Sequence, residues 1–411
     1  MAQQQADVTI IGAGAAGLMA GIWAKRTFPD QQVIILDGAR KLGAKILVSG
    51  GGRCNVTHDV VTAEAYAGSS RNAIKKVLRR FDVPQTITFF RELGVDLKRE
   101  ETGKLFPTTD SARAVLDALL NGARQAGVTI RHPHRVEQVE KTAVSFQLSG
   151  AWGQLETRRL ILATGGQSLP KSGSDGHGYR LAQALGHQLT PHIFPALVPL
   201  TLPDGHFIRE LSGITLPAAL ELRSGSGKKL ASFTDSTLCT HFGLSGPAVL
   251  DLSRHFLAAQ LDDPASYVII NWLPALPAEQ LDREFIALTN MSVGRFLRQH
   301  LPERLVLALC QTAGVDAATP GHQLARAGRK ELVTAVTQLP LPITGNRGYN
   351  VAEVTAGGVP LAELHLDSMA SRVCSGLYVC GEICDVDGRI GGYNFQWAWS
   401  SGYLAGISAG A

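Results

Sequence analysis

Short runs of apolar residues, each followed by glycine, alternate with longer amphipathic stretches along much of the chain. The first apolar run, residues 8–11, leads into a turn with Gly12, Gly14 and Gly17, then into an apolar helical stretch and a second run at 33–36. A short β-branched run before a glycine turn is typical of a buried parallel strand. The pattern therefore predicts a strand–turn–helix–strand unit at the start of an α/β fold.

The same patterns predict the elements that follow this unit. Helices are expected over 71–80, over 84–94 and from a cap at Thr109 or Asp110 to about residue 126. A hairpin is expected over 98–107, and strands over 128–132, 135–140, 143–148 and 156–162. Consecutive short strands inside an α/β pattern indicate a β-meander crossover on one face of the parallel sheet.

The sequence pattern changes near residue 190, where proline and leucine become frequent. Short apolar runs followed by glycine, as in the first part of the chain, return near residue 346. We interpret 1–189 and 346–411 as two parts of one nucleotide-binding domain. The segment 190–345 is an insertion that is β-rich over 190–275 and helical over 276–340. This organisation predicts a Rossmann-like, two-dinucleotide-binding flavoprotein fold with an inserted β-plus-helical domain.

The first glycine turn carries the chemistry of a dinucleotide fingerprint. Gly12 allows the tight turn, Gly14 lets the backbone approach a pyrophosphate, and Gly17 lets the helix pack close to the strand. The phosphates would then lie on free N–H groups at the helix start, near Ala15 and Ala16. Asp37 follows the second strand, where it can accept a hydrogen bond from a ribose hydroxyl, with Gly38 next to it.

A second glycine-rich stretch follows at 49–55. It is open to two interpretations, a flexible loop or a second backbone cradle, and we favour the cradle because it comes directly after the fingerprint. In that interpretation Lys45 and Arg53 supply charge to phosphate, and Asn55 supplies a side-chain hydrogen bond. The remaining cofactor contacts assigned here are Ser49, Gly51, Gly52, Cys54, Val136 and the strand end Thr164, Gly165 and Gly166.

The last part of the chain delivers an acid, a Gly-Gly turn and a helix. Glu382 follows Gly381 at a strand end, and a helix is expected to begin near Asn394. A helix N-terminus aimed at a flavin pyrimidine ring would stabilise the negative charge that the ring acquires on reduction. This arrangement favours FAD over NAD, with contacts from Gly381, Glu382, Asp387, Gly391, Gly392, Tyr393, Asn394 and Phe395.

Composition narrows the class of protein. The 411 residues are 45% hydrophobic and 18% charged, as in an ordinary globular protein. A net charge of +4 does not indicate nucleic acid, and the basic helix expected over 71–80 is first interpreted as a solvated face. The six scattered cysteines indicate reduced thiols in the cytoplasm. No secretory signal, membrane-crossing stretch or metal-ligand array is expected.

These motifs resemble the bacterial family of BaiN/YhiN-type NAD(P)/FAD-dependent oxidoreductases, also called the aminoacetone oxidase family. The resemblance spans nearly the whole chain, through residues 12–17, 45, 49–55, 163–166, 240–250, 355–359 and 381–402. It implies noncovalent FAD and an inserted β-plus-helical domain. Family members are linked to amine oxidation and to reduction of unsaturated steroid-like ketones, so the resemblance leaves the substrate open.

We therefore predict an FAD-dependent oxidoreductase that moves a hydride between a small organic substrate, an amine or an unsaturated ketone, and flavin N5. A single fingerprint means that NAD(P)H, where it serves as reductant, must dock transiently. His241 is the catalytic candidate, because an imidazole exchanges protons near neutral pH; a purely structural role is the alternative. Two rival functions are a flavoprotein acting on RNA and a flavin-binding sensor without turnover. The oligomeric state is left unassigned.

Overall fold

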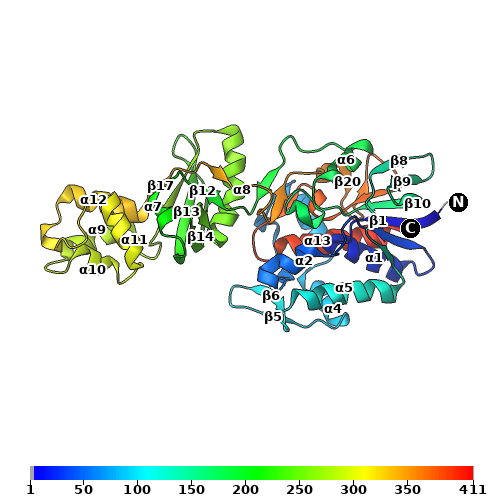
Figure 1. The fold of residues 1–411 in the computed structure, drawn as a ribbon, viewed down its shortest axis with the longest axis horizontal. Coiled ribbons are helices and arrows are strands. Elements are labelled where there is room, and N and C mark those ends of the chain that lie inside the picture. Colours follow the sequence, from blue (N-terminus) through cyan, green and yellow to red (C-terminus); the bar gives the residue numbers. More distant parts are fainter. Residues whose placement is uncertain (1–3, 411) are drawn as a thin grey trace. The chain divides into compact units, whose positions relative to one another are not determined.

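A computed structural model describes residues 4–410, which form two compact units (Figure 1). Unit 1 is Met1–Pro195 with Ala352–Ala411, and unit 2 is Ala196–Val351. Both boundaries lie a few residues beyond those expected at 189/190 and 345/346. The segment 190–195 remains with unit 1 because Thr190 is tied to Gly358, whose carbonyl accepts from Thr190 N at 3.0 Å and whose N–H donates to Thr190 Oγ1 at 2.9 Å.

The main sheet of unit 1 has the strand order β20-β21-β22-β10-β1-β2-β7. Its parallel centre places β1 (Gln4–Ile11) between β10 (Gly153–Leu162) and β2 (Val33–Leu36), with β22 (Leu377–Val379) beyond β10 and β7 (Thr129–Arg131) beyond β2. Val8, Ile10, Ile34 and Ile35 are fully buried, as expected for strands covered on both faces. The glycine turn after β1 thus lies at the carboxyl edge of the sheet, where ligands of such sheets bind.

The expected meander is present but differs from the prediction in one respect. β9 (Phe146–Gly150) pairs antiparallel with the first half of β10, and β8 (Gln138–Lys141) pairs with β9. Because β22 pairs with the second half of β10, β8 and β9 extend the sheet within its plane rather than covering one face.

The other strands of unit 1 are short, and its helices range from single turns to α13. The strands are β3 (Thr57–His58), β4 (Tyr66–Gly68), β5 (Leu97–Arg99), β6 (Lys104–Pro107), β19 (Val354–Ala356), β20 (Leu364–His365), β21 (Ala370–Ser371) and β23 (Val386–Gly388), with β11 (Phe194–Ala196) at the boundary. The helices are α1 (Ala15–Thr27), α2 (Ala44–Val48), η1 (Ser49–Gly52), η2 (Ala63–Ala65), α3 (Arg71–Leu78), α4 (Val83–Glu92), α5 (Ala112–Ala126), η3 (Pro170–Ser172), α6 (His177–Ala184), η5 (Leu361–Glu363), η6 (Gly381–Ile383) and α13 (Tyr393–Ala409).

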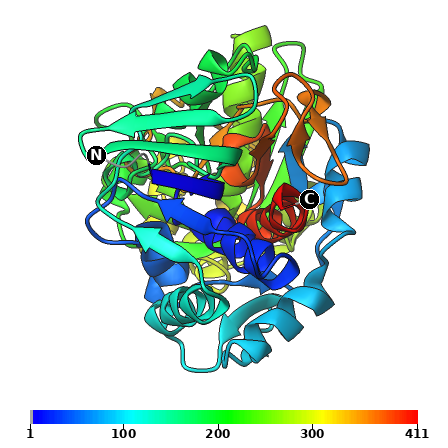
Figure 2. The same cartoon turned by 90° about the vertical axis from the view of Figure 1, so that its right-hand side faces the viewer.

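Helices α1 and α13 pack side by side in unit 1, blue and red in Figure 2. A Cβ atom on Gly402 would lie 2.5 Å from the carbonyl oxygen of Ala16, and one on Gly406 would lie 2.4 Å from that of Ala20. The backbones therefore touch through small residues. Because the contacts advance in the same direction along both helices, α1 and α13 run roughly parallel, and their N-termini face the same way.

Unit 2 is an antiparallel sheet with helices. The strand order is β17-β16-β13-β14-β15-β12-β18, and α8 (Pro247–Asp262) packs on β13 and β14. The strands are β12 (Leu200–Thr201), β13 (Thr215–Arg223), β14 (Lys229–Thr240), β15 (Gly243–Ser245), β16 (Tyr267–Asn271), β17 (Leu339–Leu341) and β18 (Gly345–Asn346). The remaining helices are α7 (Phe207–Glu210), α9 (Ala278–Ala287), α10 (Val293–Leu297), α11 (Glu303–Thr312), η4 (Gly321–Gln323) and α12 (Arg326–Thr337).

Unit 2 has its own buried core, in which Leu220, Val268, Trp272 and Phe285 are nearly inaccessible. Within residues 4–410, no helix has both the length and the apolar character that spanning a bilayer requires.

Replacing Gly406 tests the contact between α1 and α13. In an ordinary helix interior, glycine to alanine stabilises by about 1 kcal/mol. Here the new methyl group would meet the Ala20 backbone, so we expect Gly406→Ala to lower the free energy of unfolding by about 1–3 kcal/mol. Urea denaturation of the variant and of the wild type measures this difference in the free energy of unfolding. The control is Gly122→Ala in α5, whose methyl group would meet the flexible side chain of Leu93 instead. Equal or greater stability of Gly406→Ala would contradict the contact.

Candidate functional site

Gly12 and Gly17 of the first turn have the structural roles that the sequence predicts, while the contact of Gly14 with a pyrophosphate stays a prediction. Gly12 has φ +106°, and a Cβ there would lie 2.4 Å from the carbonyl oxygen of Ala163 at the end of β10. A Cβ on Gly17 would lie 1.8 Å from the carbonyl oxygen of Gly12, so the helix starts in close contact with the turn. No heavy atom outside the chain neighbours lies within 4 Å of a Cβ on Gly14. The space beside Gly14 is therefore open at the N-terminus of α1.

Asp37 braces this turn. Its Oδ2 accepts a hydrogen bond from Ala13 N at 2.6 Å, and its Oδ1 accepts one from Ala39 N at 2.7 Å. A carboxylate has about four lone-pair sites. The two backbone contacts leave acceptor capacity for the predicted ribose hydroxyl, which remains a prediction.

The glycine-rich stretch forms a left-handed loop. Gly50, Gly51 and Gly52 have φ of 56°, 67° and 86°, a backbone region that residues other than glycine rarely adopt. A Cβ on Gly51 would again meet nothing within 4 Å. Cys54 N closes the loop by donating to the carbonyl oxygen of Ser49 at 3.0 Å. The loop presents open backbone, as a cradle requires.

Arg53 lies elsewhere than predicted. Its Nη1 is 2.6 Å from Glu100 Oε1 and 3.6 Å from Asp110 Oδ1, and its guanidinium lies 4.0 Å from the ring centroid of Phe106. These contacts direct the side chain to the hairpin formed by β5 and β6. Arg53 therefore fixes the glycine loop to the hairpin, and the prediction that it supplies charge to phosphate is not supported by its placement.

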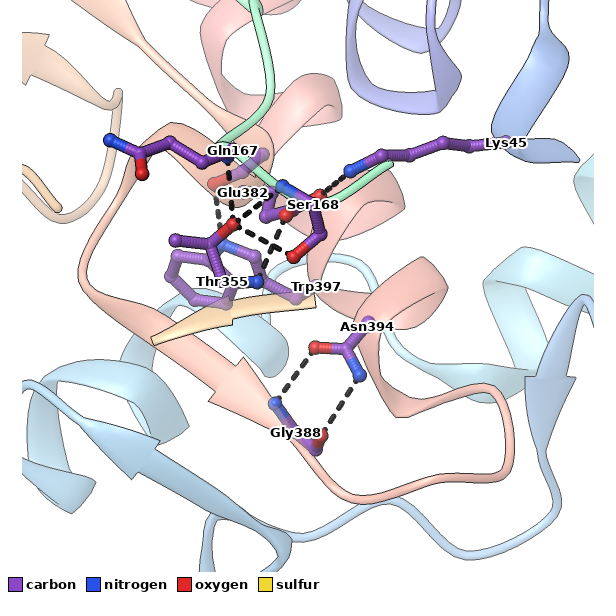
Figure 3. Close-up of polar contacts among 9 residues, drawn as sticks. Lys45, Gln167, Ser168, Thr355, Glu382, Gly388, Asn394 and Trp397 are labelled. Atoms are coloured by element: carbon purple, nitrogen blue, oxygen red, sulfur yellow. Dashed lines mark hydrogen bonds and ion pairs between the residues drawn. The ribbon is translucent and has the colours of Figure 1, made fainter. Parts of the chain in front are cut away.

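Lys45 joins a polar network that connects four distant segments (Figure 3). Its Nζ forms an ion pair with Glu382 Oε2, and Glu382 Oε1 accepts from Thr355 N at 3.1 Å. Thr355 Oγ1 in turn accepts from Gln167 N at 2.8 Å and from Ser168 N at 3.0 Å. Both charged side chains are mostly buried, 26% and 19% exposed. The network fixes α2, the loop after β10, β19 and η6 to one another.

Thr355, Gln167 and Ser168 were absent from the predicted site. The glycine pair Gly357 and Gly358, directly after the short strand β19, was the signal that could have indicated Thr355. The two other residues contribute backbone N–H groups, which no side-chain pattern identifies.

Four buried side-chain oxygens at this end of unit 1 have no hydrogen-bond partner within the described part of the chain. They belong to Asn55, Thr164, Ser172 and Ser174. Buried polar atoms are normally satisfied. Two of these residues, Asn55 and Thr164, were predicted cofactor contacts. The unpartnered oxygens and the open backbone beside Gly14 and Gly51 fit a large polar ligand such as FAD.

The turn before α13 is built on glycine. Gly391 and Gly392 have φ of 123° and 98°, and a Cβ on Gly392 would lie 2.6–2.8 Å from Thr57 backbone atoms. The first intrahelical bond of this end runs from Gln396 N to the Gly392 carbonyl. The N–H groups of residues 394 and 395, in the first turn, thus lack an intrahelical acceptor and can bind an anion.

Two predicted cofactor residues of α13 use their side chains to hold the protein together. The Asn394 amide accepts from Gly388 N at 2.8 Å and donates to Gly388 O at 2.9 Å (Figure 3). The Phe395 ring stacks on Trp399 with centroids 5.5 Å apart. What these positions can offer a cofactor is their backbone. The Tyr393 ring stacks on His58 at 5.0 Å, and Asp387 is buried on β23.

Gly381 is fixed between α1 and α13. Gly381 N donates to Ser401 Oγ, and its carbonyl accepts from Trp397 Nε1, both at 3.0 Å. A Cβ on Gly381 would lie 2.8 Å from the Ala16 methyl group. Ser401 and Trp397 are further residues that the sequence prediction missed.

Val136 is buried, and its carbonyl accepts a hydrogen bond from His177 Nε2 at 3.1 Å. Beside it, Arg135 pairs with Asp175 at 2.8 Å. These two contacts fix the loop before β8 to the start of α6. The contact of Val136 with a cofactor stays a prediction.

His241 is the one predicted site residue in unit 2. It is exposed on the turn between β14 and β15, and its ring meets Phe242 edge-on at 5.0 Å. The turn is held by other groups: Arg209 Nε donates to the His241 carbonyl at 2.8 Å, and Thr240 Oγ1 donates to the Gly243 carbonyl at 3.0 Å. The imidazole is therefore dispensable for the turn. In the described residues, no group of three or more potential ligands could hold a metal ion.

Gly14 and Gly17 give a matched pair of substitutions. Gly14→Val places a side chain in the open space beside α1, so we expect a folded protein with normal melting temperature and little bound flavin. Gly17→Val drives a side chain into the Gly12 backbone, so we expect lost stability together with lost flavin. Flavin released by heat and the thermal melting curve measure the two effects. Normal flavin content in Gly14→Val would contradict the assignment.

Comparison with known proteins shows which family has this sequence and this site. The family model described as the HI0933-like protein Rossmann domain matches residues 6–408. The chain is 35% identical over 406 residues to a 3-dehydro-bile acid delta(4,6)-reductase of Clostridium scindens, covering 98% of both proteins. It is 36% identical over 400 residues to a ribosomal RNA dihydrouridine synthase of Escherichia coli, covering 97% of this chain and 96% of that protein.

Solved structures share the fold at low identity. Quinol fumarate reductase FrdA of E. coli superposes with a TM-score of 0.53 at 16% identity, covering 100% of this chain and 70% of that one. A 3-ketosteroid delta1-dehydrogenase of Sterolibacterium denitrificans gives 0.53 at 13% identity, covering 100% of both. The predicted family, the Rossmann-type flavoprotein fold and the enzyme class, an FAD-dependent oxidoreductase, are confirmed. The chain belongs to the HI0933-like Rossmann family.

Proposed function

We propose that the protein reduces a carbon–carbon double bond conjugated to a carbonyl group, with FAD as its cofactor. The names of the relatives support this chemistry. A 3-dehydro-bile acid with 4,6 double bonds carries them in conjugation with its 3-carbonyl, and dihydrouridine is uridine whose ring double bond, conjugated to a carbonyl, has been reduced. Of the two substrate classes expected from the sequence, the amine class fits neither name. The unsaturated ketone class fits the bile acid, and uracil shares with it a double bond conjugated to a carbonyl, here the carbonyl of an imide.

The observation that carries the proposal is the open backbone beside Gly14 and Gly51, together with the N–H groups of residues 394 and 395 in the first turn of α13. Gly14 and the first turn of α1 would hold the pyrophosphate, and Asp37 the ribose. FAD, when bound, would supply a hydride from N5. The N–H groups of residues 394 and 395 would favour negative charge at the ring, worth about 0.3–2 kcal/mol for a charge at a helix end.

The reaction consumes one hydride and one proton for each double bond, the hydride going to the β-carbon and the proton to the α-carbon. We propose NAD(P)H as the source of reducing equivalents, docking transiently. Anaerobic addition of NADH or NADPH should bleach the flavin, and 2-cyclohexen-1-one, an unsaturated 3-ketosteroid or uridine monophosphate should restore its colour. Cyclohexanone, which lacks the double bond, is the matched control. Bleaching by amines, or no recovery with any unsaturated compound, would overturn the proposal; no bleaching at all would favour a sensor.

The cysteines are consistent with a cytoplasmic enzyme, which we also propose. All six are free and buried. Burial raises the pKa of the Cys54 thiol to about 12, despite a smaller opposing effect of the hydrogen bond with Ser49, and raises that of Cys380 to about 12. Cys54 is therefore a neutral thiol at physiological pH, not a nucleophile.

His241 is the proposed proton donor. Because its imidazole does not hold its turn, His241→Asn should keep normal melting and normal flavin content. Loss of acid–base catalysis would lower turnover by about 10²–10⁴-fold. The control is His300→Asn, another exposed histidine of unit 2 that contacts a phenylalanine edge, Phe296 at 5.5 Å. An unchanged rate and pH profile in His241→Asn would exclude the role.

A further inference from the structure

Helix α3 and the two residues that follow it present five cations on one side of unit 1. Arg71, Lys75, Lys76, Arg79 and Arg80, which we call the basic face, are all exposed. The opposite side of the helix is apolar: Ile74 and Val77 are fully buried, and Leu78 is nearly so.

The two ends of the basic face differ in their effect on the helix. Lys75 and Lys76 lie in the last turn, where the helix dipole favours a cation, and Arg79 is the C-cap residue. Arg71 and Lys75, however, are like charges four residues apart within α3, and such a pair destabilises a helix by about 0.2–0.5 kcal/mol. Arg71 also occupies the first helical position, where the helix dipole disfavours a cation. Departures from local stability rules are expected at functional sites.

No acid within ion-pair distance compensates these charges in the part of the chain that the structure describes. The exposed Glu64 in η2 is influenced by two of these cations without pairing with them. The pKa of its carboxyl group is lowered first by a hydrogen bond with Thr62 and more weakly by the charges of Lys75 and Arg71. Asp82, after the helix, accepts from Gln85 N as the cap of α4. The hairpin beside the glycine loop differs, because its cations Lys98 and Arg99 pair with Asp110 and Asp59.

The helix that carries the basic face is part of the scaffold of the cofactor site. α3 packs against α13 and against β4. β4 pairs with β23, which leads into Gly391 and Gly392 at the start of α13. A ligand on the basic face therefore binds the same unit as the open backbone described above.

We propose that the basic face docks the phosphate backbone of an RNA whose uracil ring is the substrate. This rests on the proposed function, because uracil contains a double bond conjugated to a carbonyl. Uncompensated cations on a rigid helix complement a polyanion, and binding releases counterions from it. RNA accounts for a charged surface that a small steroid-like ketone would not require.

The test compares two double variants with identical geometry. Arg71→Gln/Lys75→Gln alters the first and fifth positions of α3, and Arg326→Gln/Lys330→Gln alters the same positions of α12, where both side chains are also exposed. The probe is a fluorescein-labelled, protein-free ribosomal RNA fragment titrated by anisotropy between 50 and 200 mM salt, on the FAD-loaded full chain. Flavin content and melting temperature verify folding.

We expect the α3 variant to lose affinity roughly five- to tenfold and its logarithmic salt slope to fall by about 1.4, from two lost contacts to single-stranded RNA. The α12 variant should match the wild type. Equal losses in both variants, or unchanged binding by the α3 variant, would overturn the proposal. Salt-dependent binding of phosphatidylserine vesicles, but not RNA, through α3 would also overturn it. Failure of the reductase proposal is separate: unsaturated compounds would then not reoxidise the flavin, whatever the RNA affinity.

Discussion

The close contact between α1 and α13 is the constraint on which the cofactor site depends. Only residues as small as Gly402 and Gly406 let the two backbones touch, and the same contact holds Gly381 against Ala16. Because the helices are parallel and Gly402 lies level with Ala16, α13 extends about 12 Å past the start of α1. Two helix N-termini, each able to bind negative charge, therefore face one side of the unit at different depths. A long dinucleotide with a charged middle and a polarisable end suits such a pair.

Much of this site could be predicted from local sequence. The turn at Gly12, Gly14 and Gly17 combines a fixed glycine spacing with a change in hydrophobic period, and both signals are contained in a few neighbouring residues. The same holds for the loop at Gly50–Gly52, since consecutive glycines are typical of backbone with positive φ angles.

The remainder depends on contacts that no short stretch contains. Lys45 and Glu382 stand far apart in sequence and meet only when the sheet is complete. Arg53 and Asn394 have the chemistry of cofactor ligands, but a hairpin acid and the Gly388 backbone bind them first. Residue type can thus indicate what a side chain is able to bind, while tertiary packing decides which of the available partners it meets. The boundaries of the two units differ from the expected ones for a similar reason. Thr190 and Gly358, which fix the first boundary, are separated in sequence by the whole of unit 2.

The interrupted first unit also has a consequence for how the chain is made. β10 ends at Leu162 and its central partner β22 begins at Leu377, so the ribosome synthesises all of unit 2 between two neighbouring strands. Until then the edge of β10 carries unpaired N–H and C=O groups, and the small residues of α1 have no helix to cover them. Exposed strand edges are templates for aggregation. The nascent protein therefore exposes this edge for as long as unit 2 is being synthesised, and α1 gains its neighbour only when α13 has been made.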